Sequence, residues 1–234
     1  MGGYYYYDNT YLLVLIGAVI CLLASARVNT TFNRYAKVRN YSGLTGQTAA
    51  EQILRSQGIY DVRVERVSGN LTDHYDPRTK VLRLSDTTYG ASSVAAVGVA
   101  AHECGHAVQD ATGYFPLILR RTLVPVANFG SMAAWPLIII GLFIQSSSAM
   151  LFIHLGIIAF SASVLFQLVT LPVEFNASRR AVKILESTGM LNEEEVSGTK
   201  KVLKAAALTY VAGAAASILQ LLRLIAIGGR RRGE

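Results

Sequence analysis

Apolar and charged residues fall in long separate blocks along this chain, and the longest apolar block contains no charge at all. No Asp, Glu, Lys or Arg occurs between Arg121 and Glu174. Residues 122–173 are too many for one membrane helix, which needs about 20 apolar residues, and are enough for two. The polar residues 145–148 (Gln-Ser-Ser-Ser) interrupt the block. The pattern therefore predicts a transmembrane helical hairpin with spans near 122–144 and 149–172.

A second apolar segment, residues 11–26, follows four tyrosines at positions 4–7. Aromatic residues are common at membrane interfaces, so the arrangement predicts a first membrane span. A cleaved signal peptide is the alternative, because Ala24-Ser25-Ala26 resembles a cleavage site. The residues before the segment include Asp8 and no Lys or Arg, which favours an uncleaved anchor.

The last apolar segment, residues 205–229, is long enough to span a membrane but contains Gln220 and Arg223. We expect it to cross the membrane as a fourth span. The alternative is a helix that lies partly in the interface, with the basic residues 230–232 on anionic headgroups.

Basic residues follow the first segment, precede the hairpin and follow it again. They are Arg27, Arg34, Lys37, Arg39, Arg120, Arg121, Arg179, Arg180 and Lys183. If these three segments cross, all of these residues lie on one side, and the positive-inside rule makes that side cytoplasmic. A fourth span would place residues 230–232 outside, against the rule.

Composition agrees with a membrane protein, since 52% of the residues are hydrophobic and 16% are charged. The net charge of +7 is explained by membrane topology and headgroup attraction. No nucleic-acid recognition motif accompanies it, so no nucleic-acid partner is predicted. The two cysteines, Cys21 and Cys104, fit a reducing compartment without a structural disulfide.

The polar part of the chain predicts a short helix and a small sheet. Residues 48–51 (Thr-Ala-Ala-Glu) form a capping-box pattern that begins a helix ending at Gly58. Residues 62–67 alternate as a strand does, residues 76–79 are typical of a turn, and residues 81–84 predict a second strand. Such a strand could bind an extended peptide by edge pairing, although an ordinary supporting sheet is equally consistent with the pattern.

The sequence His102-Glu103-Cys104-Gly105-His106 is an HExxH motif. On a helix, residues i and i+4 share one face, so both imidazoles can bind one cation, and Glu103 can take a proton from an activated water. The preceding residues, rich in Ala and Val, predict a buried helix capped near Ser92 and ending at Gly113. A core helix that carries two histidines by coincidence is the alternative.

Two histidines leave a zinc ion without its usual third protein ligand. A histidine six residues after His106 would complete the extended metzincin motif, but Thr112 stands there. Glu174 is the first charge after the apolar block, and we expect it to open a new helix and supply the ligand. A simple interfacial glutamate is the alternative. Zinc is the default metal for such a site, with cobalt and manganese as alternatives.

A further donor should stabilise the oxyanion that develops on the substrate during hydrolysis. The candidates are Arg179, Arg180, His74 and Tyr75. His74 could equally be a turn or strand-end residue.

Four separate segments of the chain together resemble the YugP-type neutral zinc metallopeptidases of bacterial membranes. They are HECGH, residues 71–77 (LTDHYDP), residues 84–85 (LS) and residues 172–178 (PVEFNAS). The layout is more distantly similar to the HtpX-type membrane proteases and the CAAX prenyl endopeptidases. The resemblance implies that His102, His106 and Glu174 bind one catalytic zinc ion and that Glu103 is the catalytic base. The distant relatives have Asp where Ser178 stands, so support for a ligand histidine is expected elsewhere, with Asn176 as candidate.

These observations predict an α-rich integral membrane protein with a gluzincin-like HExxH helix, a small β-sheet and three or four transmembrane helices. The expected parts are an anchor (1–26), a cytoplasmic metallopeptidase half (27–121), the hairpin (122–173), a third-ligand helix and loop (174–204) and a C-terminal membrane helix with a basic tail (205–234).

The predicted function is a zinc endopeptidase of the bacterial plasma membrane, with its active site facing the cytoplasm and a protein or peptide substrate. A membrane scaffold with a structural or regulatory zinc site is one alternative, and a hydrolase of a non-protein substrate such as a lipid-linked amide is another. The intact Glu103 argues against the scaffold, because structural zinc sites need no general base. The sequence does not indicate the oligomeric state.

Overall fold

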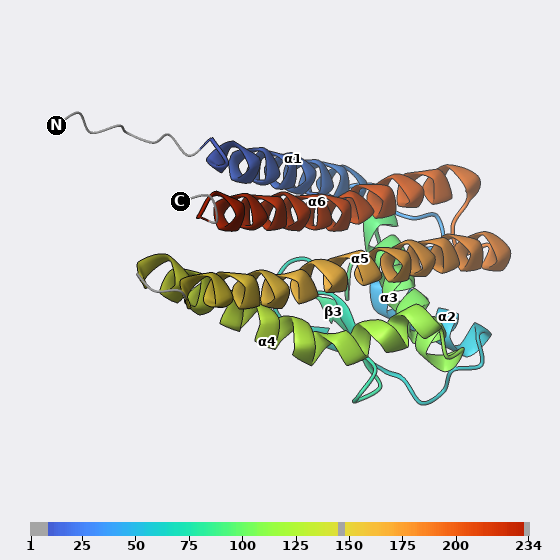
Figure 1. Cartoon of the computed structure of the whole chain (residues 1–234). Helices are drawn as coiled ribbons and strands as arrows, with labels where there is room; N and C mark the ends of the chain where they lie inside the picture. The colour runs from blue at the N-terminus through green and yellow to red at the C-terminus, as the bar shows by residue number, and fades with distance from the viewer. Residues whose placement is uncertain (1–8, 145–147, 232–234) are drawn as a thin grey trace. The chain divides into compact units, whose positions relative to one another are not determined.

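The computed structural model describes residues 9–144 and 148–231 (Figure 1). The predicted aromatic residues 4–7, most of the predicted polar break at 145–148 and Arg232 lie outside the described residues. The elements, in chain order, are α1 (Tyr11–Tyr35), α2 (Gly46–Ser56), β1 (Arg63–Val67), β2 (His74–Asp76), β3 (Val81–Ser85), α3 (Val94–Ala111), α4 (Phe115–Phe143), α5 (Ala149–Thr188) and α6 (Glu193–Arg231).

The chain forms two compact units, and four helices contribute residues to both. The sheet-containing unit comprises residues 24–119 and 170–209. The helical unit comprises the described parts of 1–23, 120–169 and 210–234. All four predicted membrane segments lie in helices that are long and apolar enough to cross a membrane, namely α1, α4, α5 and α6. The prediction of an α-rich membrane protein with a small sheet is confirmed.

Small residues allow close packing of helices within the helical unit. A Cβ added to Gly130 of α4 would lie 2.4 Å from the backbone oxygen of Ala159 in α5, so only glycine fits there. The guanidinium of Arg223 in α6 lies over the ring of Tyr11 in α1, 4.1 Å from its centroid. This cation–π contact accommodates the charge that interrupts the last apolar segment.

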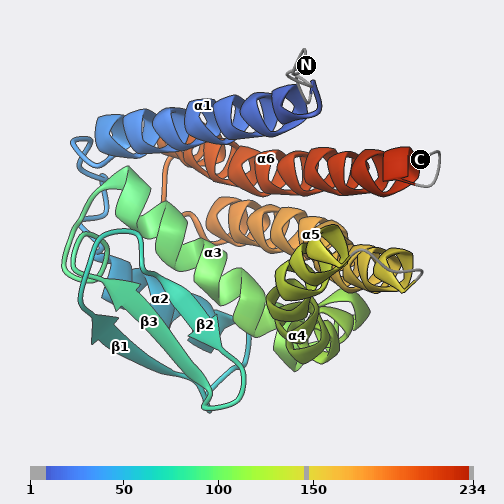
Figure 2. The same cartoon turned by 60° about the vertical axis from the view of Figure 1, so that its left-hand side comes forward.

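The sheet of the other unit has three strands in the order β1-β3-β2 (Figure 2). Strand β3 pairs in parallel with β1 and antiparallel with β2. The predicted strands at 62–67 and 81–84 correspond to β1 and β3. Strand β2 was not predicted, because it has only three residues, two of which are polar or charged, and so shows no measurable alternation.

Helix α3 lies in the core of the sheet-containing unit. It is N-capped by Ser93, whose hydroxyl accepts a hydrogen bond from the backbone N–H of Ala96, and it is followed by Gly113 at φ +63°. Fourteen of its eighteen residues are buried. Its apolar side chains share one core with α2, β3, α5 and α6, including Ile53, Leu82 and Leu185. The HExxH motif is therefore carried by a buried helix.

Two predicted helix starts were wrong. Helix α2 is capped by Thr45, whose side chain and that of Thr48 form the reciprocal capping pair, so Thr48 is inside the first turn. Glu174 does not open a new helix, because α5 runs without a break from Ala149 to Thr188. Pro172 removes one backbone hydrogen bond within α5. The helix continues because the turns that follow, with Val173 and Ala177 fully buried, pack into the core.

Candidate functional site

The side chains of His102, His106 and Glu174 converge in the sheet-containing unit. Carboxylate oxygen Oε2 of Glu174 lies 3.2 Å from Nε2 of His102 and 3.6 Å from Nε2 of His106. One potential ligand atom from each residue lies within 4.8 Å of the others. All three side chains are largely shielded from solvent. The packing of α3 against α5 thus brings together His102 and Glu174, which are 72 positions apart in the chain.

This donor set fits zinc. Two ligand atoms at zinc distances of about 2.0–2.1 Å, arranged tetrahedrally, lie roughly 3.3 Å apart. The separations of 3.2 and 3.6 Å between the carboxylate oxygen and the two imidazole nitrogens are close to that value. Two imidazoles and one carboxylate leave a fourth position for water or substrate, as in catalytic zinc sites.

A glycine inside the motif permits this approach. A Cβ added to Gly105 would lie 2.5 Å from the backbone oxygen of Ala177, a distance that real Cβ atoms do not show. The absence of a side chain lets α3 touch the backbone of α5 directly at the turn between the two histidines. The same contact brings Glu174 and Ser178, one turn apart on α5, against the motif.

The second ring nitrogen of each histidine has a partner that orients the ring. Nδ1 of His106 lies 3.0 Å from Oε1 of Gln109, and Nδ1 of His102 lies 3.1 Å from the hydroxyl of Ser178. An amide oxygen only accepts hydrogen bonds, so Nδ1 of His106 carries a proton, and Nε2 is the nitrogen that remains to bind a metal. The Gln109 contact therefore favours the tautomer of His106 that binds a metal through Nε2, while the Ser178 hydroxyl, which can donate or accept, orients the ring of His102.

Gln109 also ties the motif helix to α5. Its amide nitrogen donates to the backbone oxygen of Val173 at 2.8 Å and to Oδ1 of Asn176 at 3.0 Å. That Asn176 oxygen also accepts from Nε of Arg180 at 2.8 Å. Asn176 was predicted to support a ligand histidine. In the structure Gln109 contacts the histidine and Asn176 lies one hydrogen bond further away.

Glu103 is buried beside the cluster. Its side chain projects from the same turn as His102, and the residue is only 7% exposed. Burial raises its pKa to about 7, the neighbouring His102 opposes the rise, and the carboxylates of Glu174 and Asp73 add to it. The backbone N–H of Tyr75 in β2 donates a hydrogen bond to Glu103, which also opposes the rise. A carboxyl group with a pKa near neutrality is suited to accept and return a proton.

The four predicted oxyanion donors occupy different positions. The Tyr75 hydroxyl donates to Asp110 at 2.9 Å, and Arg180 is held by Asn176. His74 is exposed, with its Nδ1 2.8 Å from the backbone oxygen of Thr72. Arg179 is exposed and lines a pocket between α5 and α6. Tyr75 reaches Glu103 through its backbone, while Arg180 is joined to His106 through Asn176 and Gln109.

Gln109 and Gly105 were not singled out from the sequence. Gln109 follows His106 by three residues, so the two side chains lie on one face of the helix. The spacing alone could therefore have identified Gln109 as an amide next to the metal ligands. Gly105 could not be recognised in this way, because its role depends on the backbone of α5. Ser178 was noted only as a departure from a distant pattern, yet its hydroxyl contacts His102 directly.

Replacing Gln109 with Met is expected to weaken zinc binding by about 10–100-fold, the range typical for groups that orient a ligand histidine. Methionine keeps most of the volume but removes the acceptor for His106 and the two donors to α5. Zinc affinity can be measured by competition with a chelator, with Gln52→Met on the exposed face of α2 as matched control. Equal zinc affinities for Gln109→Met and the wild type would contradict the positioning role.

Comparisons with known proteins identify the family of the chain. Residues 10–229 match the family model described as "Putative neutral zinc metallopeptidase". The chain is 49% identical over 211 residues to the protein named "Putative membrane protease YugP" of Bacillus subtilis (strain 168), covering 90% of this chain and 92% of that protein. No solved structure matches the chain. A family model that covers nearly the whole chain and a relative at this identity establish that the protein is a member of this family of membrane zinc metallopeptidases.

Proposed function

We propose that this protein is a zinc endopeptidase of the gluzincin type, built from HExxH and a glutamate of a later helix segment. One observation carries the proposal: the potential ligand atoms of His102, His106 and Glu174 converge within 4.8 Å, and the carboxyl group of Glu103 is buried beside them. Family membership supports a membrane zinc protease in general. The individual roles of these residues are inferred from their chemistry.

The mechanism assigns a separate task to each residue. Bound zinc would supply Lewis-acid activation of a water molecule and of the scissile carbonyl. His102, His106 and Glu174 hold the ion, with Gln109 and Ser178 fixing the two imidazole rings. Glu103 accepts the proton of the attacking water and passes it to the leaving amine. Burial raises the pKa of Glu103 above that of an ordinary carboxyl group, which makes it a stronger proton acceptor.

The substrate would be an extended peptide that lies along β2. This strand is at the edge of the sheet, and the backbone N–H of Tyr75 within it reaches Glu103. A peptide paired with such an edge receives main-chain hydrogen bonds that do not depend on its sequence. The scissile bond would then pass beside the motif, and side-chain pockets would determine any selectivity.

The active site would face the cytoplasm of a bacterial cell. The positive-inside rule supports this orientation, because most basic residues near the candidate spans belong to the chain segments of the sheet-containing unit. With four crossings, both ends of the chain would be on the opposite side, and residues 230–232 would then be the exception to the rule.

A purely structural zinc site is the weaker candidate. Structural zinc sites usually have four protein ligands and no buried carboxyl group in addition to them. Burying Glu103 costs free energy, as its raised pKa indicates, and a scaffold would gain nothing from that cost. The surplus carboxyl group therefore favours catalysis.

Removal of zinc provides the test. The protein purified in detergent should cleave casein, lose at least about 99% of this activity after treatment with a strong chelator, and regain it with one equivalent of zinc. His106→Ala purified in the same way controls for contaminating proteases and should stay inactive after zinc is added. Casein cleavage that survives metal removal would contradict the proposal. Zinc-dependent hydrolysis of lipid-linked amides without casein cleavage would favour a non-protein substrate.

A further inference from the structure

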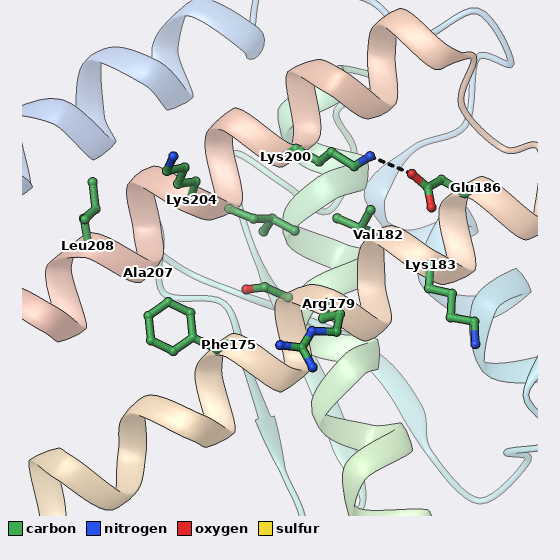
Figure 3. A pocket seen from close by; sticks show the side chains of 11 residues that line it. Phe175, Arg179, Val182, Lys183, Glu186, Lys200, Lys204, Ala207 and Leu208 are labelled. Carbon is green, nitrogen blue, oxygen red and sulfur yellow. Dashed lines mark hydrogen bonds and ion pairs between the residues drawn. The ribbon is translucent and has the colours of Figure 1, made fainter.

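A pocket of about 450 Å³ lies between α5 and α6 in the sheet-containing unit (Figure 3). Phe175, Ala207 and Leu208 lie towards one end of it, and the side chains of Arg179 and Lys204 follow next to them. The pocket thus combines an apolar end with cationic groups. A volume of this size is typical of sites for small amphiphilic ligands.

The charges of this pocket are unbalanced. Arg179, Lys183, Lys200 and Lys204 are its cations, and Glu186 is its single carboxylate. Glu186 is already paired with Lys200, with 2.7 Å between the carboxylate oxygen and the ammonium nitrogen. Across residues 9–144 and 148–231 no acidic partner is found for the other three cations. The pocket is therefore complementary to an anion.

The order of apolar and cationic residues matches the interface of a membrane. In α5, Phe175 lies two residues after the charge-free block that ends at residue 173, next to Glu174, and Arg179 is one turn further on. In α6, Lys204 is the last charged residue before an apolar stretch that continues to Arg223. The apolar end of the pocket thus adjoins the membrane-type sequence of both helices, and the cations lie on the polar side of that boundary. A phospholipid has the same order of groups, with acyl chains followed by a phosphate.

We propose that this pocket binds an anionic phospholipid. The phosphate would lie between Arg179 and Lys204, and the first part of an acyl chain would lie on Phe175 and Leu208. An acidic peptide would be attracted by the same cations, but its acidic side chains would leave the apolar end uncovered. Phe175 is 44% exposed, and an acyl chain would cover this ring.

The bound lipid would lie next to the candidate metal site. Ser178 lines the pocket and its hydroxyl is 3.1 Å from Nδ1 of His102. Phe175 directly follows Glu174 in the chain. The proposal does not depend on the proposed peptidase activity, because the pocket and its charges are separate from the chemistry of zinc.

Native mass spectrometry of the delipidated full-length protein in detergent can test the proposal. We expect phosphatidylglycerol to bind at least about tenfold more tightly than phosphatidylcholine with the same acyl chains. The double variant Arg179→Ala/Lys204→Ala should lower the affinity for phosphatidylglycerol to that for phosphatidylcholine. The matched double variant Arg55→Ala/Lys201→Ala removes two exposed cations outside the pocket and should bind as the wild type does.

A third variant tests the apolar end of the pocket. Two soluble competitors test whether the pocket binds a small phosphate or an acidic peptide instead of a lipid. Leu208→Asn should weaken phosphatidylglycerol binding severalfold and leave the weak binding of glycerol phosphate unchanged. Equal affinity for both lipids, or unaltered phosphatidylglycerol binding in Arg179→Ala/Lys204→Ala, would overturn the proposal. Glycerol phosphate that competes as well as the lipid would assign the pocket to a small phosphate ligand. An acidic peptide that displaces phosphatidylglycerol at equal concentration would assign it to a peptide.

Discussion

Glu103→Gln is expected to reduce the rate of casein cleavage by about 10²–10⁴-fold, the usual contribution of a general acid–base group. Glutamine has nearly the same shape as glutamate but cannot take a proton from water. Because Glu103 is not among the three converging metal donors, zinc content should remain at the wild-type level. Zinc stoichiometry and cleavage rate are measured on the same sample, with Glu194→Gln on the exposed first turn of α6 as control. Retained zinc with an unchanged rate would exclude Glu103 as the base.

The same substitution should also change the pH dependence of stability in the metal-free protein. The pKa of Glu103 rises from 4.5 to about 7 on folding, so the folded state holds a proton that the unfolded chain releases between these values. Ionisation of this carboxyl group therefore does not lower the free energy of unfolding below pH 4.5. Above pH 7 it lowers the free energy of unfolding by its full amount, roughly 3 kcal/mol. Glu103→Gln removes this pH-dependent loss of stability. Its melting temperature without metal should exceed that of the wild type at pH 8 and match it at pH 4.5.

The membrane architecture was predictable because charge is excluded from lipid whatever the tertiary structure. The charge-free block between Arg121 and Glu174 is visible in the sequence alone, and α4 and α5 correspond to its two predicted spans. The ends of these helices were not predictable in the same way. Helix α5 continues fifteen residues past position 173, because its polar continuation buries Ala181 in the shared core and packs the backbone of Ala177 against Gly105 of α3.

The candidate metal site was predictable in part. His102, Glu103 and His106 lie within five consecutive residues, so the period of a helix is sufficient to place them together. Glu174 is 72 residues away from His102, and no local pattern relates the two. Its selection depended on its place after the apolar block and on the family resemblance. The groups that hold the imidazole rings, Gln109 and Ser178, were not predicted because their contacts depend on how closely α3 and α5 approach at Gly105.

Glu174→Ala should abolish stoichiometric zinc binding and casein cleavage together. Two imidazoles would remain, and the loss of zinc affinity should exceed the 10–100-fold typical for removing a group that only orients a ligand. Glu174→Gln should have a similar effect, because a neutral amide is a poor zinc ligand. Glu186→Ala is the matched control, since Glu186 is an exposed glutamate of the same helix whose recorded partner is Lys200.

Metal analysis of Glu174→Ala and His106→Ala, prepared in parallel, distinguishes the third ligand from a neighbouring carboxylate. Both variants should lack zinc if the ion is shared by α3 and α5. Zinc retained in Glu174→Ala and lost only in His106→Ala would remove α5 from the metal site. The 3.2 and 3.6 Å separations would then reflect a carboxylate held by two imidazoles in the metal-free protein. If both lose zinc, the segment after the charge-free block supplies a ligand, and the metal site is completed only by residues that follow the two candidate spans that α4 and α5 share with that block.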